Sequence, residues 1–599
     1  MRNFTVTVLD TTGIQPYIFG SNRLRENIGA SYLVSQATDN WVRDALNKLK
    51  EKIEPKVYAF DPEQHQPEAK PYIEDSELAA ELVYAGGGNT VLLFSEKQYA
   101  VRFTQILSKR ILEEAPGINL VAVHQEFDWD SRSLYEVVGH LMKYDLDAKK
   151  RSRIPSAPLL GLSVTASCRS TQLVAVNTSE NYIKAEEEEA KYLISRETEA
   201  KLRVVSSNHG TTTNEANKAL REKFKEVLEN TDYQFPYRID HLGRSKDKSS
   251  YVAVVHADGN DMGKRFQAFG EGKCNRDYII DMRKLSHSVN QAGINALKKV
   301  VQVLVNSIEV DADGKRKVKG RFEIKDNYLP FRPLVYGGDD VTFVCDGRLG
   351  LELAAIYLEE LEKQPIADVG LTQRLQTQGQ PRGDCPYKAP YMAALRKSYD
   401  GKPIKACAGV CVVKTHYPFA RAYQLSEDLC RKAKKFVKDE NKGDFSALDW
   451  HLAASGLSGS ISEIRQREYQ VPDGSLAIRP VSLRKEKDSD WRTWEGFTKV
   501  VKQFSEDEEW KGRHNKVMAL RDVLRQGSEA TQEFLKNYRI KDEQLPRFPE
   551  FSGQSKSLAK DGWLNRICGY FDAIEAMEFY ISLKEEDNAN LPTENTTVE

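Results

Sequence analysis

Cysteine pairs at metal-binding spacing are missing from this sequence. Its eight cysteines are scattered along the chain, and no two of them are separated by only two residues. Zinc ribbons use C-x-x-C pairs, and small secreted domains use dense, regularly spaced cysteines for their disulfides. We therefore expect neither a zinc site nor a disulfide framework.

The sequence also lacks a long apolar run and a strong charge of either sign. No stretch is long and apolar enough to span a bilayer, and the first residues, MRNFTVTVLD, do not form a signal peptide. The 87 basic and 88 acidic residues leave a net charge of −1. These absences argue against a membrane protein and against a broadly basic protein that coats nucleic acid, so we expect a cytoplasmic protein.

What the sequence does contain is one order of elements, present twice. The first copy predicts a strand, a helix, a β-hairpin, a helix and a strand at 4–10, 24–53, 81–95, 97–117 and 118–127. The second copy predicts the same elements at 250–266, 276–307, 332–347, 350–364 and 405–419. This β-α-β-β-α-β order is the ferredoxin-like pattern found in polymerase palm domains and nucleotide cyclases.

The repeat predicts an α+β protein with two ferredoxin-like palm domains, a mostly helical middle region and a helical C-terminal domain. A Gly-, Pro- and Gln-rich insertion at 365–404 interrupts the second palm, and the last residues have the composition of a disordered tail. The predicted divisions are a first palm at 1–129, a middle region at 130–245, a second palm at 246–450, a C-terminal domain at 451–585 and a tail at 586–599.

The central hairpins of the two copies differ in their turns. The first hairpin turns at GGGN, whereas the second, RPLVYGGDDVTFVCDG, turns at GGDD. The glycines Gly337 and Gly338 permit unusual turn dihedrals and let a phosphate approach the backbone. Gly and Asp are also ordinary turn residues, but the GGGN hairpin shows that the turn does not need the acids.

The second hairpin is expected to meet a third carboxylate, because the first strand of this topology lies beside the hairpin and ends at Asp258. Adjacent carboxylates about 4 Å apart repel by roughly 4 kcal/mol at an effective dielectric of 20. Bound cations would offset this cost, and oxygen-only ligands suit Mg²⁺ or Mn²⁺. We therefore predict that Asp258, Asp339 and Asp340, with the backbone of Gly259, hold two such ions for phosphoryl chemistry, with Asp339 and Asp340 as the catalytic acids.

Several neighbouring residues are candidates for contact with a nucleotide. Lys434, on the helix after the last strand, is the first choice for a phosphate, and Lys435 is a weaker candidate on the same basic helix. Asp261 is a candidate at the turn after Asp258, although an N-cap role suits it better. Lys432, Lys264 and Arg265 fit a solvated surface at least as well, and the histidines fit packing roles better than metal binding: His256, His287 and His416.

Four separated segments resemble one protein family. They are GIQPYIFGSNRLRENIGASYLV, HADGNDMG, YGGDDVTF and AGVCVVKTHYPFARAYQLSEDLCRKAKK. In this order they resemble the large polymerase-like subunit of type III CRISPR effector complexes, over most of residues 1–450. The resemblance implies that ATP is converted to cyclic oligoadenylates by a site containing Asp258, Asp339 and Asp340. It also implies that the first palm, whose only strand-end acid is Asp10, helps to bind the acceptor ATP without catalytic metal.

The sequence departs from that family at two points. It has no H-D doublet near its start that would supply the family's nuclease metals, and it lacks the zinc-binding cysteine cluster. We therefore do not expect DNA cleavage by this chain. Its partners are guide or target RNA and other CRISPR effector subunits, or it acts as a stand-alone member of an antiviral signalling system.

Two other functions stay open at this point. GGDD approximates the GGDEF signature, so a diguanylate-cyclase-like enzyme that uses GTP is the alternative enzyme. The non-enzymatic alternative is a scaffold subunit that binds RNA, and the basic segments at 147–153 and 484–492 are its candidate RNA-binding regions. Both segments carry few aromatic residues, so a solvated surface explains them as well as an RNA site does.

Overall fold

The structure, a computed structural model, describes most of the chain. The described residues are 2–51, 56–86, 88–152, 164–184, 191–206, 214–242, 250–270, 273–366, 402–439, 444–453, 459–484, 491–540, 544–549, 551 and 554–584. Most of the predicted insertion, most of the basic segment at 484–492 and the whole predicted tail lie outside them. None of the described helices is long and apolar enough to cross a membrane.

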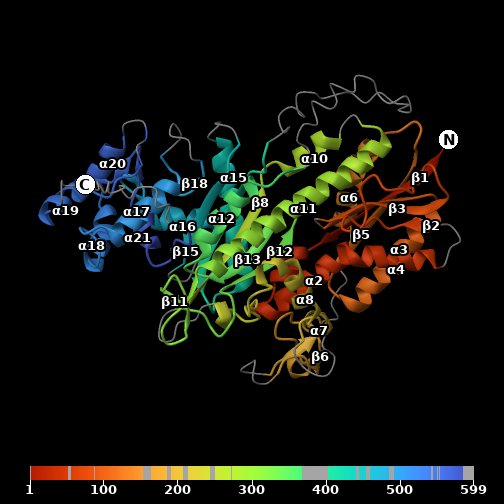
Figure 1. The fold of residues 1–599 in the computed structure, drawn as a ribbon, viewed down its shortest axis with the longest axis horizontal. Coiled ribbons are helices and arrows are strands. Elements are labelled where there is room, and N and C mark those ends of the chain that lie inside the picture. The colour runs from red at the N-terminus through yellow and green to blue at the C-terminus, as the bar shows by residue number, and fades with distance from the viewer. Residues whose placement is uncertain are drawn as a thin grey trace, which may run out of the picture.

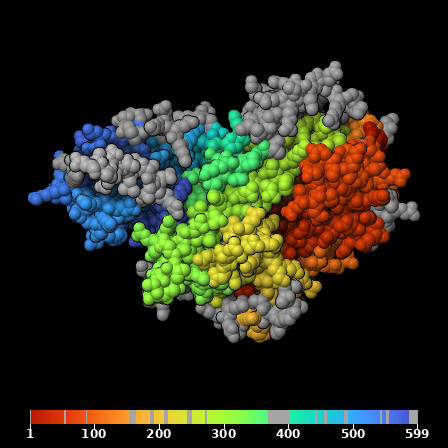
Figure 2. Space-filling model, in the orientation of Figure 1, coloured from red at the N-terminus to blue at the C-terminus, as the bar shows by residue number. Residues whose placement is uncertain are grey.

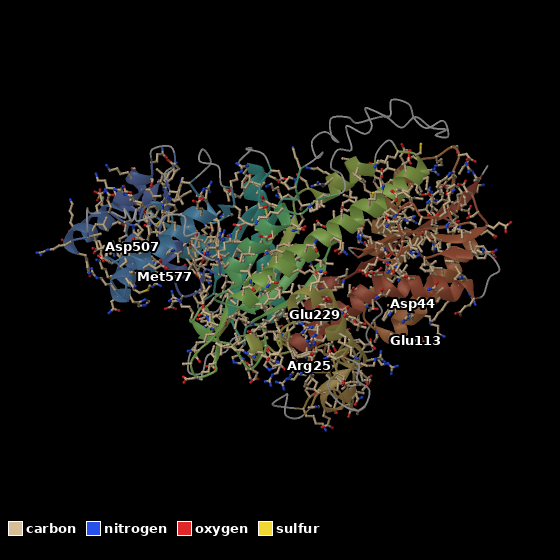
Figure 3. The ribbon with its side chains drawn as sticks, viewed as in Figure 1. Arg25, Asp44, Glu113, Glu229, Asp507 and Met577 are labelled. Atoms are coloured by element: carbon tan, nitrogen blue, oxygen red, sulfur yellow. The ribbon has the colours of Figure 1, made fainter. Side chains whose placement is uncertain are left out.

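A mixed five-stranded sheet is built from the first 128 residues. Its order is β2-β3-β4-β1-β5, with strands rich in Val, Leu and Thr that are buried along most of their length. The strands are β1 (Asn3–Thr12), β2 (Lys56–Tyr58), β3 (Leu78–Gly86), β4 (Asn89–Phe94) and β5 (Asn119–Asp128). The helices of this part are α1 (Ile14–Phe19), α2 (Leu24–Thr38), α3 (Asn40–Lys50) and α4 (Lys97–Glu114). In Figure 3, Asp44 of α3 and Glu113 of α4 lie on the same side of this part.

A second mixed sheet repeats this arrangement. Its six strands have the order β12-β13-β8-β14-β15-β18, and the first four follow the same order as β3-β4-β1-β5. The strands are β8 (Tyr251–Gly259), β12 (Phe331–Gly337), β13 (Asp340–Asp346), β14 (Ala406–Lys414), β15 (Ala447–Leu452) and β18 (Val481–Ser482). The helices are α10 (Met262–Gly270), α11 (Asn275–Asn306), α12 (Gly350–Glu362) and α15 (Phe419–Asp439). The sequence therefore predicted the four strands that the two sheets share, but not β2 of the first sheet.

The sequence did not predict the last two strands of the second sheet. β15 pairs in parallel with β14, and β18 pairs with β15. All six residues of β15, ALDWHL, are buried. From Leu448 to Leu452 apolar and polar residues alternate, which is the pattern typical of a strand, so the signal for β15 is present in the sequence even though its polar residues are buried as well.

Smaller elements complete the chain. Those between the two sheets are α5 (Leu134–His140), the π-helical turn Leu141–Asp145, α6 (Leu146–Ser152), β6 (Ala175–Thr178), β7 (Leu193–Ser195), α7 (Arg196–Arg203), α8 (Glu215–Lys223) and α9 (Lys225–Leu228). Three short strands that were not predicted follow α11: β9 (Ile308–Val310), β10 (Arg316–Val318) and β11 (Phe322–Glu323). All three lie before β12 in the chain.

The C-terminal part is mostly helical, as the sequence indicated, but it also contains a small four-stranded sheet. The helices are α16 (Ile461–Glu468), α17 (Trp494–Glu506), α18 (His514–Leu524), α19 (Ser528–Asn537), α20 (Ser555–Asp561) and α21 (Phe571–Ala576). The strands are β16 (Gln470–Val471), β17 (Gly474–Ser475), β19 (Trp563–Leu564) and β20 (Ile567–Cys568). Figure 2 shows this part at the opposite end of the molecule from the first sheet.

Helix α11 connects the two large sheets. It runs between them in Figure 1 and contacts β3 of the first sheet as well as β12 and α12 of the second. Its Arg283 is fully buried, donates to the backbone of β3 and pairs with the buried Glu81, which also pairs with Arg276. Reciprocally, Ser31 of α2 donates to the carbonyl of Leu334 in β12. Thus α11, which follows β8 and α10, bonds to the first sheet, and α2, which follows β1 and α1, bonds to the second.

Candidate functional site

The tip of the second hairpin is a two-residue turn. Gly337 and Asp340 are the last paired residues of β12 and β13, and Gly338 has a φ of 72°, in the left-handed region that favours glycine. The amide of Gly338 donates to Asn290 of α11 at 3.2 Å. A Cβ atom on Gly293 of α11 would lie only 2.5 Å from the carbonyl oxygen of Gly338. A glycine and an asparagine on α11 therefore seat the tip, and sequence reasoning identified neither.

The register of the sheet brings the predicted carboxylates to one end of it. Val341 of β13 pairs with Ala257 of β8, so Asp340 and Asp258 follow as the next opposed positions. Gly259 is packed directly against Asp339: a Cβ atom there would lie 2.9 Å from the Asp339 Cβ and 2.6 Å from the Met262 Cγ. Gly259 thus lets the turn approach the end of β8.

The carboxylates of the turn are held in an unfavourable environment for negative charge. Burial, together with the charge of Asp258, raises the pKa of Asp339 from 3.8 to about 6. The same two causes raise the pKa of Asp340 to about 7. The Oδ1 atom of Asp340 is enclosed and makes no hydrogen bond among the described residues, while half of this side chain is exposed.

These oxygens match the ligands that Mg²⁺ or Mn²⁺ prefers, and a cation would remove the charge cost and supply a partner for the Asp340 oxygen. The three side chains do not form a ready-made cluster, however. Among the described residues, no group of three His, Cys, Asp or Glu side chains is close enough to hold a metal ion. The metal role of Asp258, Asp339, Asp340 and Gly259 stays a prediction.

The lysines of α15 separate into three environments. Lys434 Nζ donates to Asp258 Oδ2 at 2.5 Å and to the carbonyl of Gly259 at 2.9 Å. Burial opposes its charge, but the bond and the charge of Asp258 raise the pKa of Lys434 overall. Lys432 instead donates to Ser462 at 2.8 Å, and Lys435 is exposed. Of the three, Lys434 is the lysine that contacts Asp258 and Gly259.

The turn after Asp258 does not supply a phosphate-binding pair of cations. Asp261 has a φ of 50° and forms an ion pair with Lys264 at 2.9 Å. Arg265, expected on a solvated surface or at a phosphate, is buried and donates to the carbonyls of Lys402 and Pro403 at 2.6 and 3.4 Å. That expectation for Arg265 is wrong, because the arginine fastens the segment leading to β14.

His256 lies one row deeper than the acids, on the same face of the sheet. It is opposed to Thr342, and its Nδ1 lies 3.2 Å from the threonine hydroxyl and 3.4 Å from Asp340 Oδ1. Its ring also meets the edge of Tyr423 of α15, and burial lowers its pKa. The packing role predicted for His256 agrees with its burial, but sequence reasoning did not find its contact with Asp340.

The first sheet shows the same positions without the acids. Asp10 is opposed to Asn89, as Asp258 is to Asp340, and the Asn89 amide can donate to both Asp10 oxygens at 3.2 Å. Lys150 of α6 forms an ion pair with Asp10. The strand-end acid of the first sheet is therefore neutralised by residues of the chain itself.

No protein-family model matches the chain, and no curated protein matches it by sequence. Solved structures do. The Csm1-Csm4 cassette in complex with pppApApA gives a TM-score of 0.48 at 11% identity, covering 96% of this chain and 70% of that chain. Csm1 in T. onnurineus gives 0.46 at 12% identity, covering 97% and 70%.

Over nearly its whole length, the chain is structurally similar to Csm1. One of the similar structures is the Csm1-Csm4 subcomplex of the type III-A CRISPR-Csm interference complex, with a TM-score of 0.46 and 10% identity over 96% of this chain and 70% of that one.

Proposed function

We propose that the chain is a Mg²⁺-dependent nucleotidyltransferase that joins ATP into cyclic oligoadenylates. The observation that carries this proposal is the end of the second sheet, where the register opposes Asp340 to Asp258, Gly259 packs against Asp339, and burial raises the pKa of both turn carboxylates. The first sheet has the same hairpin without this charge cost, so the fold does not require it. The choice of ATP rests on the resemblance of the sequence motifs to the type III CRISPR subunit.

Asp258, Asp339, Asp340 and the carbonyl of Gly259 would hold the ions. When bound, Mg²⁺ ions supply charge stabilisation at the α-phosphate and lower the pKa of the attacking hydroxyl. In the reaction a ribose hydroxyl oxygen forms a bond to the α-phosphorus, the bond from that phosphorus to the β,γ-phosphates breaks, and pyrophosphate leaves. The hydroxyl proton passes to solvent.

The remaining residues of the chain bind and orient the substrate in this proposal. The backbone of Gly337 and Gly338 leaves room for a phosphate beside the turn. Lys434 directs its ammonium to the triphosphate, and Lys435 and Asp261 lie at the margin of the site. The first sheet, in which Asp10 is already neutralised, contributes a binding surface for the acceptor nucleotide and no ion.

Incubation of the full chain with ATP and Mg²⁺, with and without candidate activating RNA, tests the proposal. We expect pyrophosphate release and a cyclic product by mass spectrometry. The double substitution Asp339→Ala with Asp340→Ala should abolish the product. Asp313→Ala, which changes an acid in the exposed turn between β9 and β10, is the matched control and should leave it unchanged.

The alternatives give different results in the same experiment. Turnover of GTP in preference to ATP would replace the proposal with a diguanylate-cyclase-like activity. No product from any nucleoside triphosphate, with RNA or other CRISPR effector subunits co-purifying, would replace it with a scaffold function. A product formed by the chain alone would indicate that it acts outside a larger complex.

A further inference from the structure

A cation of the protein itself lies where the proposed metal site begins. The Lys434 ammonium is 2.5 Å from Asp258 Oδ2 and 2.9 Å from the carbonyl oxygen of Gly259. Both oxygens belong to the ligand set proposed above. An ion that used them would occupy the same space as the ammonium, so the lysine and the ion exclude one another at these atoms.

The first sheet contains a comparable lysine, Lys150, beside a single strand-end acid. Lys150 comes from α6, the last part of the helical segment 134–152 that follows β5, and α15 follows β14 in the same way. It pairs with Asp10, and Asn89 supplies an amide to the same carboxylate. One acid thus meets one lysine, and the charge is balanced.

The second sheet is not balanced in this way. Lys434 meets Asp258, but Asp339 and Asp340 add two carboxylates that Asn89 and its turn lack. One lysine cannot neutralise three acids, whereas divalent ions carry the missing charge. Replacing the ammonium at Asp258 by an ion lets all three carboxylates share the cations and frees the lysine.

We propose that Lys434 is a displaceable cation: it holds Asp258 in the metal-free protein, gives up Asp258 and Gly259 when metal binds, and is then available to the triphosphate. This inference rests on the metal binding in the proposed function but not on turnover. It makes Lys434 a sensor of site occupancy as well as a substrate contact. A nucleotide that arrives before the metal would meet a lysine that is already engaged.

The accessibility of the Lys434 amine tests the exchange directly. Two samples of the full chain, one in EDTA and one in Mg²⁺ without nucleotide, are treated briefly with an acetylating reagent. Acetylation of each lysine is then quantified by mass spectrometry. Because a partly exposed ion pair is weak, we expect Mg²⁺ to raise the rate at Lys434 by roughly 3- to 10-fold. Lys432, bonded to Ser462 on the same helix, is the internal control and should not respond.

Calorimetry of Mg²⁺ binding to the same sample separates a failure of the exchange from a failure of metal binding. An unchanged Lys434 rate together with measured Mg²⁺ binding would overturn the exchange and leave the proposed function standing. Exchange without any nucleotide product would leave the inference standing and overturn the proposed activity. No Mg²⁺ binding would overturn both. With Asp339→Asn and Asp340→Asn, the response of Lys434 to Mg²⁺ should be lost.

A second measurement uses Lys434→Met, which keeps the aliphatic stem and removes the competitor. We expect its affinity for Mn²⁺, followed by electron paramagnetic resonance of the free ion, to be tighter than that of the unsubstituted protein by roughly 3- to 10-fold. Lys432→Met, with the same change of charge two residues away, should leave the affinity unchanged within about twofold. Equal effects of the two substitutions, or weaker binding by Lys434→Met, would refute the exchange.

Discussion

Asparagine at positions 339 and 340 is expected to make the metal-free protein more stable at pH 8. The substitutions keep the shape of the side chains and remove charges that the fold disfavours. The sign follows from the pKa values: the folded carboxyls hold protons up to about pH 6 and 7, whereas unfolded aspartates release them near 3.8. Between these values the folded state binds more protons, so the free energy of unfolding falls as pH rises through this window.

The magnitude can be worked out for Asp340. The difference between a pKa of 3.8 and one of about 7 corresponds to about 4 kcal/mol for the ionised group above pH 7. Half of the side chain is exposed, and solvent screening reduces this to about 1–2 kcal/mol. With Asp339 included, we expect about 2 kcal/mol, or a melting temperature higher by roughly 4–8 °C for a unit of about 200 residues.

The assay is thermal unfolding of the full chain and the double variant in EDTA, from pH 4 to pH 8. The gap between the two proteins should be near zero at pH 4 and largest at pH 8. Mg²⁺ at pH 8 should raise the melting temperature of the unsubstituted protein and leave that of the variant unchanged, because binding to the folded state stabilises it. A variant that is less stable than the parent at pH 8, or a gap that does not depend on pH, would refute the charge-cost argument.

Two further predictions concern neighbours of the turn. Gly259→Ala should weaken Mn²⁺ binding and lower the melting temperature, because its Cβ would lie 2.9 Å from that of Asp339. Gly263→Ala in α10 meets nothing within 4 Å, so it should leave Mn²⁺ binding unchanged and should not lower the melting temperature; equal behaviour of the two variants in a Mn²⁺ titration would contradict the role of Gly259. His256→Val removes the ring nitrogen 3.4 Å from Asp340 and should weaken Mn²⁺ binding by roughly 5-fold; it should also lower the melting temperature, because the buried Thr342 hydroxyl loses its partner. His256→Gln should restore part of both, and unchanged Mn²⁺ affinity of the folded His256→Val protein would indicate a packing role alone.

The order of the four strands that the two sheets share could be predicted because local signals agree with the topology. Each hairpin is marked by glycines between two apolar runs, and each amphipathic helix separates it from the next strand. The same signals place Asp258 beside Asp340, since the register carries both to the same end of the sheet. No chemistry beyond β-sheet geometry was needed for that pairing.

The contacts made across the chain could not be predicted. Asn290 and Gly293 seat the hairpin tip from the middle of a 32-residue helix, where the sequence shows only ordinary helical periodicity. Arg265 looks like a surface cation because it follows Lys264 directly after a turn, but its guanidinium reaches carbonyls nearly 140 residues away. Such positions are decided by tertiary packing, which a single sequence does not display.

Comparison of the two sheets supplies a signal that neither motif gives alone. At the row beneath the acids, the second sheet has His256 opposed to Thr342, whereas the first has Val8 opposed to Val91, both fully buried. Burying a polar pair costs free energy unless each member is hydrogen-bonded, and His256 and Thr342 meet this condition by contacting one another at 3.2 Å; the valines of the first sheet show that packing alone does not require the polar pair. It occurs in the sheet whose strand ends carry Asp258 and Asp340, and its histidine contacts one of those acids. The polar row thus lies beside the acids of the proposed metal site, and the first sheet has valines at the corresponding positions.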